Sequence, residues 1–362
     1  MTFWPKHWGA WLGMLLAFAA ATEAIAAVTG PCSDCHTMHY SQDGGVLGEW
    51  SGPGPHQSLL TTTCIGCHTG SNRGGDTPFV FSVSAPLYDS YGIEVGTDTL
   101  AGGNFYWVTQ AGGDNRGHNV AGLAAADPGF SLPPGFEGGR MAEDGSIPGG
   151  GVWPAGQQVT CAGVYGCHGS HAENIPTLAI KGGHHKGQSG HIIPAEPFAA
   201  ESGYRMLVGV AGYEDPAWEY QPTSTRHNQY KGVDSPEVLT DLSTIGSMCA
   251  RCHGQYHDGS GNVGSRSPWV RHPTDYDMGN TAAASEYRDY GGSGVNAYQV
   301  GVPLASVDVS LVRTSVSFAD DTIVTCLSCH RAHGSPWYRS LRWDYVGNPM
   351  GGGCAVCHTS KD

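Results

Sequence analysis

Twelve cysteines occur as six pairs, and a histidine directly follows the second cysteine of every pair. Five pairs have the spacing C-x-x-C-H: Cys32/Cys35/His36, Cys64/Cys67/His68, Cys249/Cys252/His253, Cys326/Cys329/His330 and Cys354/Cys357/His358. The sixth is wider, with Cys161 and Cys167 preceding His168. Two thiols about one helical turn apart can bond to the two vinyl groups of one porphyrin, and the next histidine then lies under the iron. The pattern predicts six covalently bound haem c groups, each with a proximal histidine.

Other uses of paired cysteines account for the pattern less well. Disulfides are common in exported proteins, but they require no histidine after the second cysteine. Zinc sites also use C-x-x-C, yet they need no histidine in this fixed place six times. A redox dithiol would occur once, near a βαβ pattern. For Cys161 and Cys167 a disulfide is the main alternative, because the longer spacer requires a bulged loop to attach haem.

Six irons need six further ligands if each is closed on both faces, and eleven other histidines are available in the chain after residue 30. Four of these lie three or four residues after a motif histidine: His39, His171, His257 and His333. Such a histidine cannot reach the far face of its own haem, because the porphyrin plane lies between. It can reach the iron of a neighbouring haem, so these four predict closely spaced haems, each turn joining two of them.

Two histidines far from any motif complete the predicted set of distal ligands. His118 and His272 lie among glycine or proline residues that would fix a loop against a flat ring. The adjacent pair His184 and His185, in the segment GGHH, is held in reserve. Methionine could also ligate iron, but with histidine in surplus the sequence favours bis-histidine sites.

The first 26 residues predict a signal peptide that is removed on export. Lys6 precedes an apolar run over 9–21, and Ala24-Ile25-Ala26 resembles a cleavage site. Residues 27–362 would then form a single hexahaem domain outside the cytoplasm, in the periplasm or at the outer cell surface. No later segment is apolar enough to span a bilayer.

Composition favours a mostly irregular chain with short helices and a few short strands. Glycine accounts for 55 residues and proline for 22, while charged residues make up only 14%. Strand-like patches cover 79–83 and 105–108, and helices are expected near 204–210 and 235–248. Haems would supply the apolar mass that long elements normally give. The net charge of −14 argues against nucleic acid as a partner and suits cationic partners or oxide surfaces.

Several segments resemble the OmcS-type hexahaem outer-surface cytochromes of metal-respiring bacteria, some of which polymerise into filaments. The similarity is carried by CHTMH at 35–39, by MCARCH at 248–253 with RHP at 271–273, and by CLSCHRAH at 326–333. It implies a stack of six bis-histidine haems and supports the six distal ligands named above. Two features depart from the family: the wider third motif and GGHH. Filament-forming relatives carry a histidine just before the first motif, and residues 27–31 contain none, which leaves polymerisation open.

The leading functional hypothesis is an electron conduit without substrate chemistry, acting in extracellular electron transfer with other redox cytochromes or metal oxides. The alternative is a multihaem reductase of a small oxyanion, which needs one iron with an open position. Many such enzymes replace a proximal histidine with lysine, and none of the six motifs does so. A third possibility, a filament subunit or docking protein, differs in assembly rather than in chemistry.

Overall fold

The computed structural model describes residues 30–39, 41–42, 45–46, 56–73, 77–89, 100–136, 153–185, 190–192, 203–235, 241–257, 274–292, 296–349 and 352–360. The predicted signal peptide and His272 lie outside these residues. Within them, the chain is mostly irregular, with short helices and strands, as the composition predicted. No helix in the described part of the chain is long and apolar enough to cross a membrane.

Most α-helices of the described residues are the haem motifs themselves. These are α1 (Cys64–Cys67), α3 (Ile245–His253), α4 (Cys326–Cys329) and α5 (Cys354–Cys357), whereas α2 (Pro176–Ala179) carries no motif. The first motif begins with the 3-10 turn η1 (Cys32–Asp34). Helix α3 is the longest of this group, and Thr244 caps its start, its side chain accepting a hydrogen bond from the Ser247 N–H.

The third motif is built on strands instead of a helix. Strands β3 (Thr160–Ala162) and β4 (Gly166–His168) pair in parallel around a tight loop, which is the bulge that the long spacer required. Gly163 makes the loop possible, with a φ of +93° and with the Glu173 carbonyl oxygen 2.5 Å from the place where a Cβ would stand. Both cysteines of this motif thereby reach neighbouring positions despite five intervening residues.

The remaining strands are short. One sheet has the order β5-β6-β7-β9-β10-β8, and a separate hairpin pairs β1 (Ser41–Gln42) with β2 (Gly45–Val46). The strands of the larger sheet are β5 (Gly190–Ile192), β6 (Gly212–Glu214), β7 (Gln229–Lys231), β8 (Tyr276–Asp277), β9 (Ala305–Ser306) and β10 (Ile323–Val324). In that sheet β7 and β9 run parallel, and the other pairs are antiparallel.

Two of the predicted elements are wrong and two are shorter than expected. Residues 105–108 form a 3-10 turn, η3 (Phe105–Trp107), since the Asn104 side chain caps it by accepting from the Tyr106 N–H. Residues 79–83 contribute only an isolated bridge. The helix near 204–210 is the single turn η6 (Tyr204–Met206), and the helix expected over 235–248 begins at Ile245.

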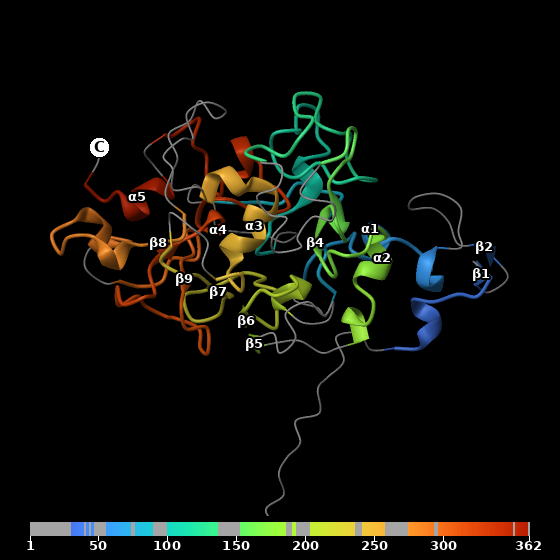
Figure 1. Cartoon of the computed structure of the whole chain (residues 1–362), viewed down its shortest axis with the longest axis horizontal. Coiled ribbons are helices and arrows are strands. Elements are labelled where there is room, and N and C mark those ends of the chain that lie inside the picture. Colours follow the sequence, from blue (N-terminus) through green and yellow to red (C-terminus); the bar gives the residue numbers. More distant parts are fainter. Residues whose placement is uncertain are drawn as a thin grey trace, which may run out of the picture.

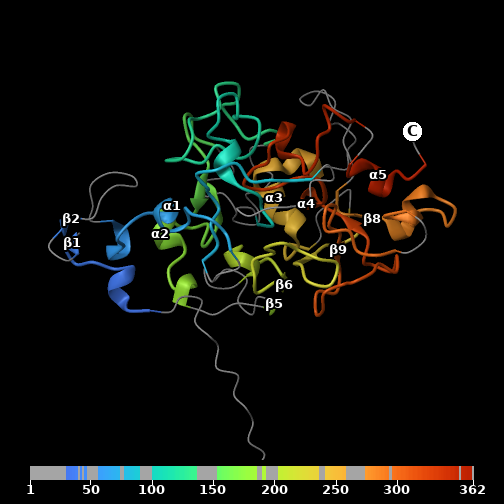
Figure 2. The ribbon, with the colours of Figure 1, turned by 180° about the vertical axis from the view of Figure 1, so that it is seen from behind.

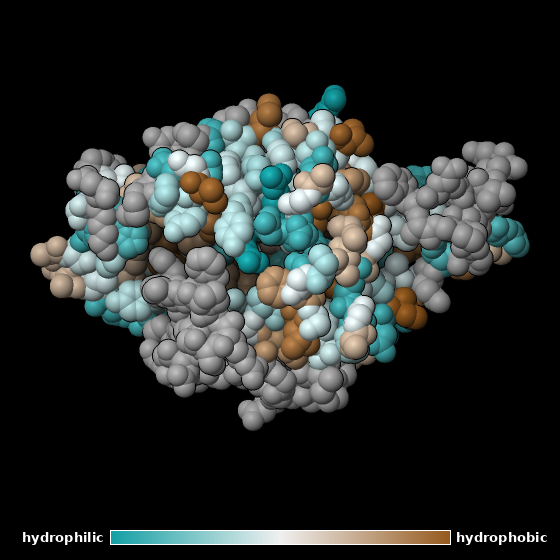
Figure 3. All heavy atoms as spheres, turned by 90° about the horizontal axis from the view of Figure 1, so that it is seen from above, coloured by the Kyte–Doolittle hydropathy of each residue, from teal (hydrophilic) through white to brown (hydrophobic). Residues whose placement is uncertain are grey.

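The apolar core is divided into small clusters, and each touches a different motif or its neighbour. The largest comprises Tyr204, Val210, Tyr230, Ile245, Met248, Ala305 and Ile323, with Leu327 of α4 packed against it. The other three clusters meet Cys357, Cys161 and Cys252. The face seen in Figure 3 likewise shows apolar side chains in scattered spots among polar ones. This distribution fits a protein whose apolar interior is completed by large prosthetic groups.

Candidate haem sites

The six motifs lie one after another in sequence order. In Figure 1 the first motif is at the right, followed leftwards by α1, β4, α3, α4 and α5, and Figure 2 shows the same order from behind. The first and last motifs therefore lie at opposite ends of the molecule. A row of haems attached here would run from one tip to the other.

Contacts between the cysteines of successive motifs confirm this order. The Cys64 thiol is hydrogen bonded to Cys161, which lowers the pKa of Cys64 to about 7. A hydrogen bond with Cys326, and then burial, raises the pKa of Cys249. These two contacts join the second motif to the third and the fourth to the fifth.

The other neighbours are linked through the effects of one thiol on another. Burial, and then the charge of Cys35, raises the pKa of Cys67, so the first two motifs are close together. Burial, followed by the charge of Cys167, raises the pKa of Cys252 to about 12, which links the third motif to the fourth. Burial and then Cys357 and Cys354 raise the pKa of Cys329, which links the last two motifs.

Each motif histidine directs its Nδ1 atom to an oxygen of the protein. The acceptors are Ser58 O for His36 (3.0 Å), Pro78 O for His68 (2.7 Å), Arg205 O for His168 (2.9 Å), Pro134 O for His253 (2.6 Å), Arg339 O for His330 (2.8 Å) and Glu286 Oε1 for His358 (3.3 Å). An Nδ1–H donated to an oxygen fixes the tautomer and leaves the Nε2 lone pair for a metal. All six rings are therefore prepared as ligands, including that of the wide third motif.

Four motif histidines also face a second histidine at a nearly constant separation. The ring centroids are 6.3 Å apart for His36 and His185, 6.1 Å for His68 and His184, 6.4 Å for His168 and His333, and 6.1 Å for His253 and His118. A ligating nitrogen lies about 2 Å from its metal and the ring centre about 1 Å farther, so two rings on opposite sides of one metal are about 6 Å apart. The residues present thus fit an iron held between two imidazoles.

Among the predicted distal ligands, the structure brings His118 and His333 to a motif histidine and places others differently. His118 directs its Nδ1 to Ala332 O at 2.5 Å, and burial lowers the pKa of His333 to about 3, which keeps its ring neutral. His39 is exposed, and the Nε2 of His171 contacts the Arg251 guanidinium. The side chain of His257 and all of His272 lie outside what the structure describes. The ligand roles of these four histidines stay predictions.

The oxygens that hold the motif histidines are mostly backbone atoms, so no residue type in the sequence marks them, and the sequence offers His184 and His185 only as a reserve pair. His227 is buried and stacks on Tyr298, with ring centroids 3.9 Å apart, so it is part of the core.

Three of the motifs share one arrangement, which we call the carbonyl clamp. A 3-10 turn presents two successive carbonyl oxygens: the first accepts from the histidine Nδ1–H, and the second accepts from the N–H of the residue after that histidine. The turns are η2 (Gln57–Leu59), η6 and η11 (Tyr338–Ser340), serving the first, third and fifth motifs. In each, the two residues that present the carbonyls have positive φ values, between 51° and 59°. Backbone in this region is costly for non-glycine residues and persists only where its surroundings hold it.

Ser58 provides a clean test of the carbonyl clamp, because its side chain is exposed and only its backbone contacts His36. Ser58→Val should lower the free energy of unfolding by about 1–2 kcal/mol, since a β-branched residue is strongly disfavoured at a φ of 59°. Ser58→Gly is the matched control and should change it by less than about 0.5 kcal/mol. Denaturant titration followed at the haem absorbance measures both. Equal stabilities of the two variants would show that the turn geometry does not hold this site.

The last motif differs because its histidine is paired with a carboxylate. Glu286 Oε1 faces His358 Nδ1, while Glu286 Oε2 accepts from the N–H and hydroxyl of Ser360. A carboxylate partner makes an imidazole more electron-donating and so lowers the reduction potential of the iron it binds. We expect the last haem to be held at a lower potential than carbonyl partners would give it.

Removal of this negative charge is predicted to change one midpoint potential. Glu286→Gln should raise one midpoint potential in the reductive titration by roughly 50–100 mV, the effect of one nearby charge in a partly screened site. Spectroelectrochemical titration of the whole protein measures it. Asp289→Asn removes an equal charge one turn away and serves as the control. A shift of the same size in both variants would exclude a specific effect through His358.

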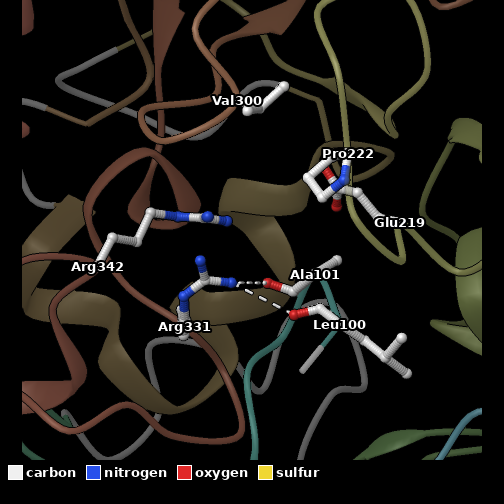
Figure 4. Close-up of a pocket in the computed structure, with 7 residues that line it drawn as sticks. All are labelled: Leu100, Ala101, Glu219, Pro222, Val300, Arg331 and Arg342. Carbon is white, nitrogen blue, oxygen red and sulfur yellow. Dashed lines mark hydrogen bonds between the residues drawn. The ribbon is translucent and has the colours of Figure 1, made fainter. Parts of the chain in front are cut away.

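Positive charge gathers beside the fifth motif. Figure 4 shows the Arg331 and Arg342 side chains next to each other at a cavity that Glu219 also lines. Arg331 donates to the carbonyl oxygens of Leu100 and Ala101, and burial raises the pKa of Glu219 against the lowering effect of Arg342. The cavity, about 10 Å³, has room for roughly one water molecule and is not a substrate chamber. The two cations should favour the reduced state of the neighbouring iron.

These sites define a multihaem c-type cytochrome, and comparison with known proteins agrees. The family model described as the doubled CXXCH motif matches residues 318–362, which contain the last two motifs. The chain is similar to C-type cytochrome OmcS of Geobacter sulfurreducens, with 26% identity over 392 residues that cover 91% of this chain and 82% of the relative. This similarity confirms the resemblance inferred from the motifs.

Two solved structures from the same organism also align with the chain. One is the Outer Membrane Cytochrome S filament, with a TM-score of 0.47 and 20% identity over 89% of this chain and 85% of the other. The second, of OmcS nanowires, gives a TM-score of 0.45 and 19% identity over 87% and 84% of the two chains.

Proposed function

We propose that this chain is an exported electron conduit that carries electrons through six covalently bound haems in extracellular electron transfer. The observation that carries the proposal is the row of six motifs in sequence order, each with its histidine Nδ1 directed to an oxygen. Haem iron supplies reversible one-electron chemistry when it is bound. The chain's own part is to place the ligands, fix their tautomers and set the local charge.

The count of six includes the wide third motif. The neighbouring His168 has the same type of oxygen partner as the regular motifs and faces His333 at the separation of the other pairs. These features support haem at this site and disfavour the disulfide alternative.

Histidine on both faces of each iron would leave no open position for a substrate, which is why we propose an electron carrier and not an enzyme. His118 and His333 are proposed as distal ligands of the fourth and third haems on the geometry above. His257 and His272 remain candidates from the sequence, with neither assigned to a particular iron. His39 and His171 remain candidates that compete with His184 and His185.

The proposed partners are other redox cytochromes or extracellular metal oxides, which the net charge of −14 suits where their surfaces are cationic. Assembly with further copies of the chain is proposed on the similarity to a cytochrome whose nanowires have been solved. Export rests on the signal peptide predicted for residues 1–26, and the site of action is the outer cell surface or beyond it.

The proposal is tested on protein made in a host competent in cytochrome maturation. Intact mass should show six haem additions, and magnetic resonance of the oxidised protein should show only low-spin ferric iron. Five haem additions would show that Cys161 and Cys167 hold no haem. A high-spin ferric signal from the unmodified protein would indicate an open iron and favour a reductase. A colourless product would contradict the whole assignment.

A further inference from the structure

Two adjacent histidines reach two different haem sites. His185 faces His36 with a ring separation of 6.3 Å and planes only 8° apart, and His184 faces His68 at 6.1 Å with planes 35° apart. His36 and His68 belong to separate motifs, so consecutive residues lie opposite the proximal ligands of the first and second haems. The separations match those of His118 and His333 with their own partners.

The backbone before this pair explains how both rings are delivered. Helix α2 follows the third motif and contacts η2, the turn that holds His36. The chain then turns at Gly182, with a φ of +83°, and enters η5 (Gly183–His185). A side chain on Gly183 would meet the Met206 sulfur at 2.6 Å, so the segment lies tightly against η6. GGHH is therefore fixed between two of the carbonyl clamps.

We propose that His185 and His184 are the distal axial ligands of the first and second haems, so that one two-residue unit closes two irons. The inference deepens the proposed function and rests on haem attachment at Cys32/Cys35 and Cys64/Cys67. Because the two ligands are neighbours in the chain, they hold the first two haems as a fixed pair. His39 and His171 are the competing residues: His39 is exposed, and Arg251 occupies the Nε2 of His171.

The test uses the full-length, haem-loaded protein. His185→Ala should keep six haems by mass, since its cysteines are intact, but one ferric iron should become high-spin and one ferrous iron should bind carbon monoxide. Added imidazole should restore the low-spin state. His184→Ala should give one such iron, and the double variant two. His39→Ala and His171→Ala should give none, and a high-spin iron in either of these, with His185→Ala silent, would overturn the assignment.

A second pair of variants identifies which iron is affected. In a Cys32→Ser/Cys35→Ser background, which lacks the first haem, His185→Ala should add no high-spin signal, whereas His184→Ala still should. His185→Met, which keeps a ligand on the iron, should remain low-spin and raise one midpoint potential. The methionine variant replaces the alanine variant as the test if His185→Ala does not assemble with its haems. Unchanged midpoint potentials in His185→Met would count against the proposal. Unmodified protein without haem, or with a high-spin iron, would contradict the proposed function instead.

Discussion

Replacing Cys161 and Cys167 together by serine should leave a protein with five haems instead of six. The thiols of this motif contact the second motif through Cys64 and influence the fourth through Cys252, so the lost haem is an internal one. Electron transfer from the first haem to the last should then fall by orders of magnitude, because tunnelling must bridge the gap. Intact mass counts the haems. The rate of electron transfer along the protein is measured with one end of the protein docked to an electrode.

The control addresses the possibility that the double variant does not fold. Proteolysis of the unmodified protein should release a haem-bearing peptide that contains both Cys161 and Cys167. The same peptide without haem, joined by a disulfide, would refute the proposed third site regardless of how the variant behaves. The single variant Cys161→Ser should keep its haem on one thioether bond.

His333→Ala should leave the iron of the third haem without its distal ligand, although His333 lies three residues from the histidine of the fifth motif. His333 faces His168 at 6.4 Å, and burial holds its pKa near 3, so its neutral ring is available to that iron at every physiological pH. One high-spin ferric iron should appear among the six. The signal should vanish when Cys161 and Cys167 are also replaced and persist when Cys326 and Cys329 are replaced instead.

His118→Ala is the matched comparison, because it should open the fourth haem in the same way. If His333→Ala changed only the haem bound at Cys326 and Cys329, the idea that one turn serves two haems would be wrong.

The proximal sites could be predicted from the sequence because their chemistry is local. Two thiols and a histidine within a few residues specify attachment without knowledge of the fold. His333 is predicted for a related reason, since a histidine one turn along cannot reach the far face of its own haem, and the structure places its ring opposite that of His168. His118 was suggested by its loop, and the structure places it opposite His253.

The rest depends on contacts between distant parts of the chain. His185 lies opposite His36 because of how the third motif packs, and no local periodicity in the sequence indicates this contact. The segment GGHH, two glycines before two histidines, is the available signal. The oxygens on the motif histidines are mostly backbone atoms, which carry no residue identity. One weak sequence signal for the carbonyl clamps is Tyr-Arg-x-Leu, which occurs at 204–207 and again at 338–341, where two of the clamps lie. The strand predicted at 105–108 failed because the Asn104 cap favoured a turn.

Each of the four paired sites draws its two histidines from remote stretches: His36 with His185, His68 with His184, His118 with His253, and His168 with His333. None of these four pairs is therefore contained in a short contiguous piece of the polypeptide. Single motifs cannot be exchanged with a homologue one at a time, and a nonsense codon between residues 170 and 184 would remove the partners of His36 and His68 although both motifs remain. Natural or laboratory recombination of such genes should succeed only when both halves of every pair are inherited together.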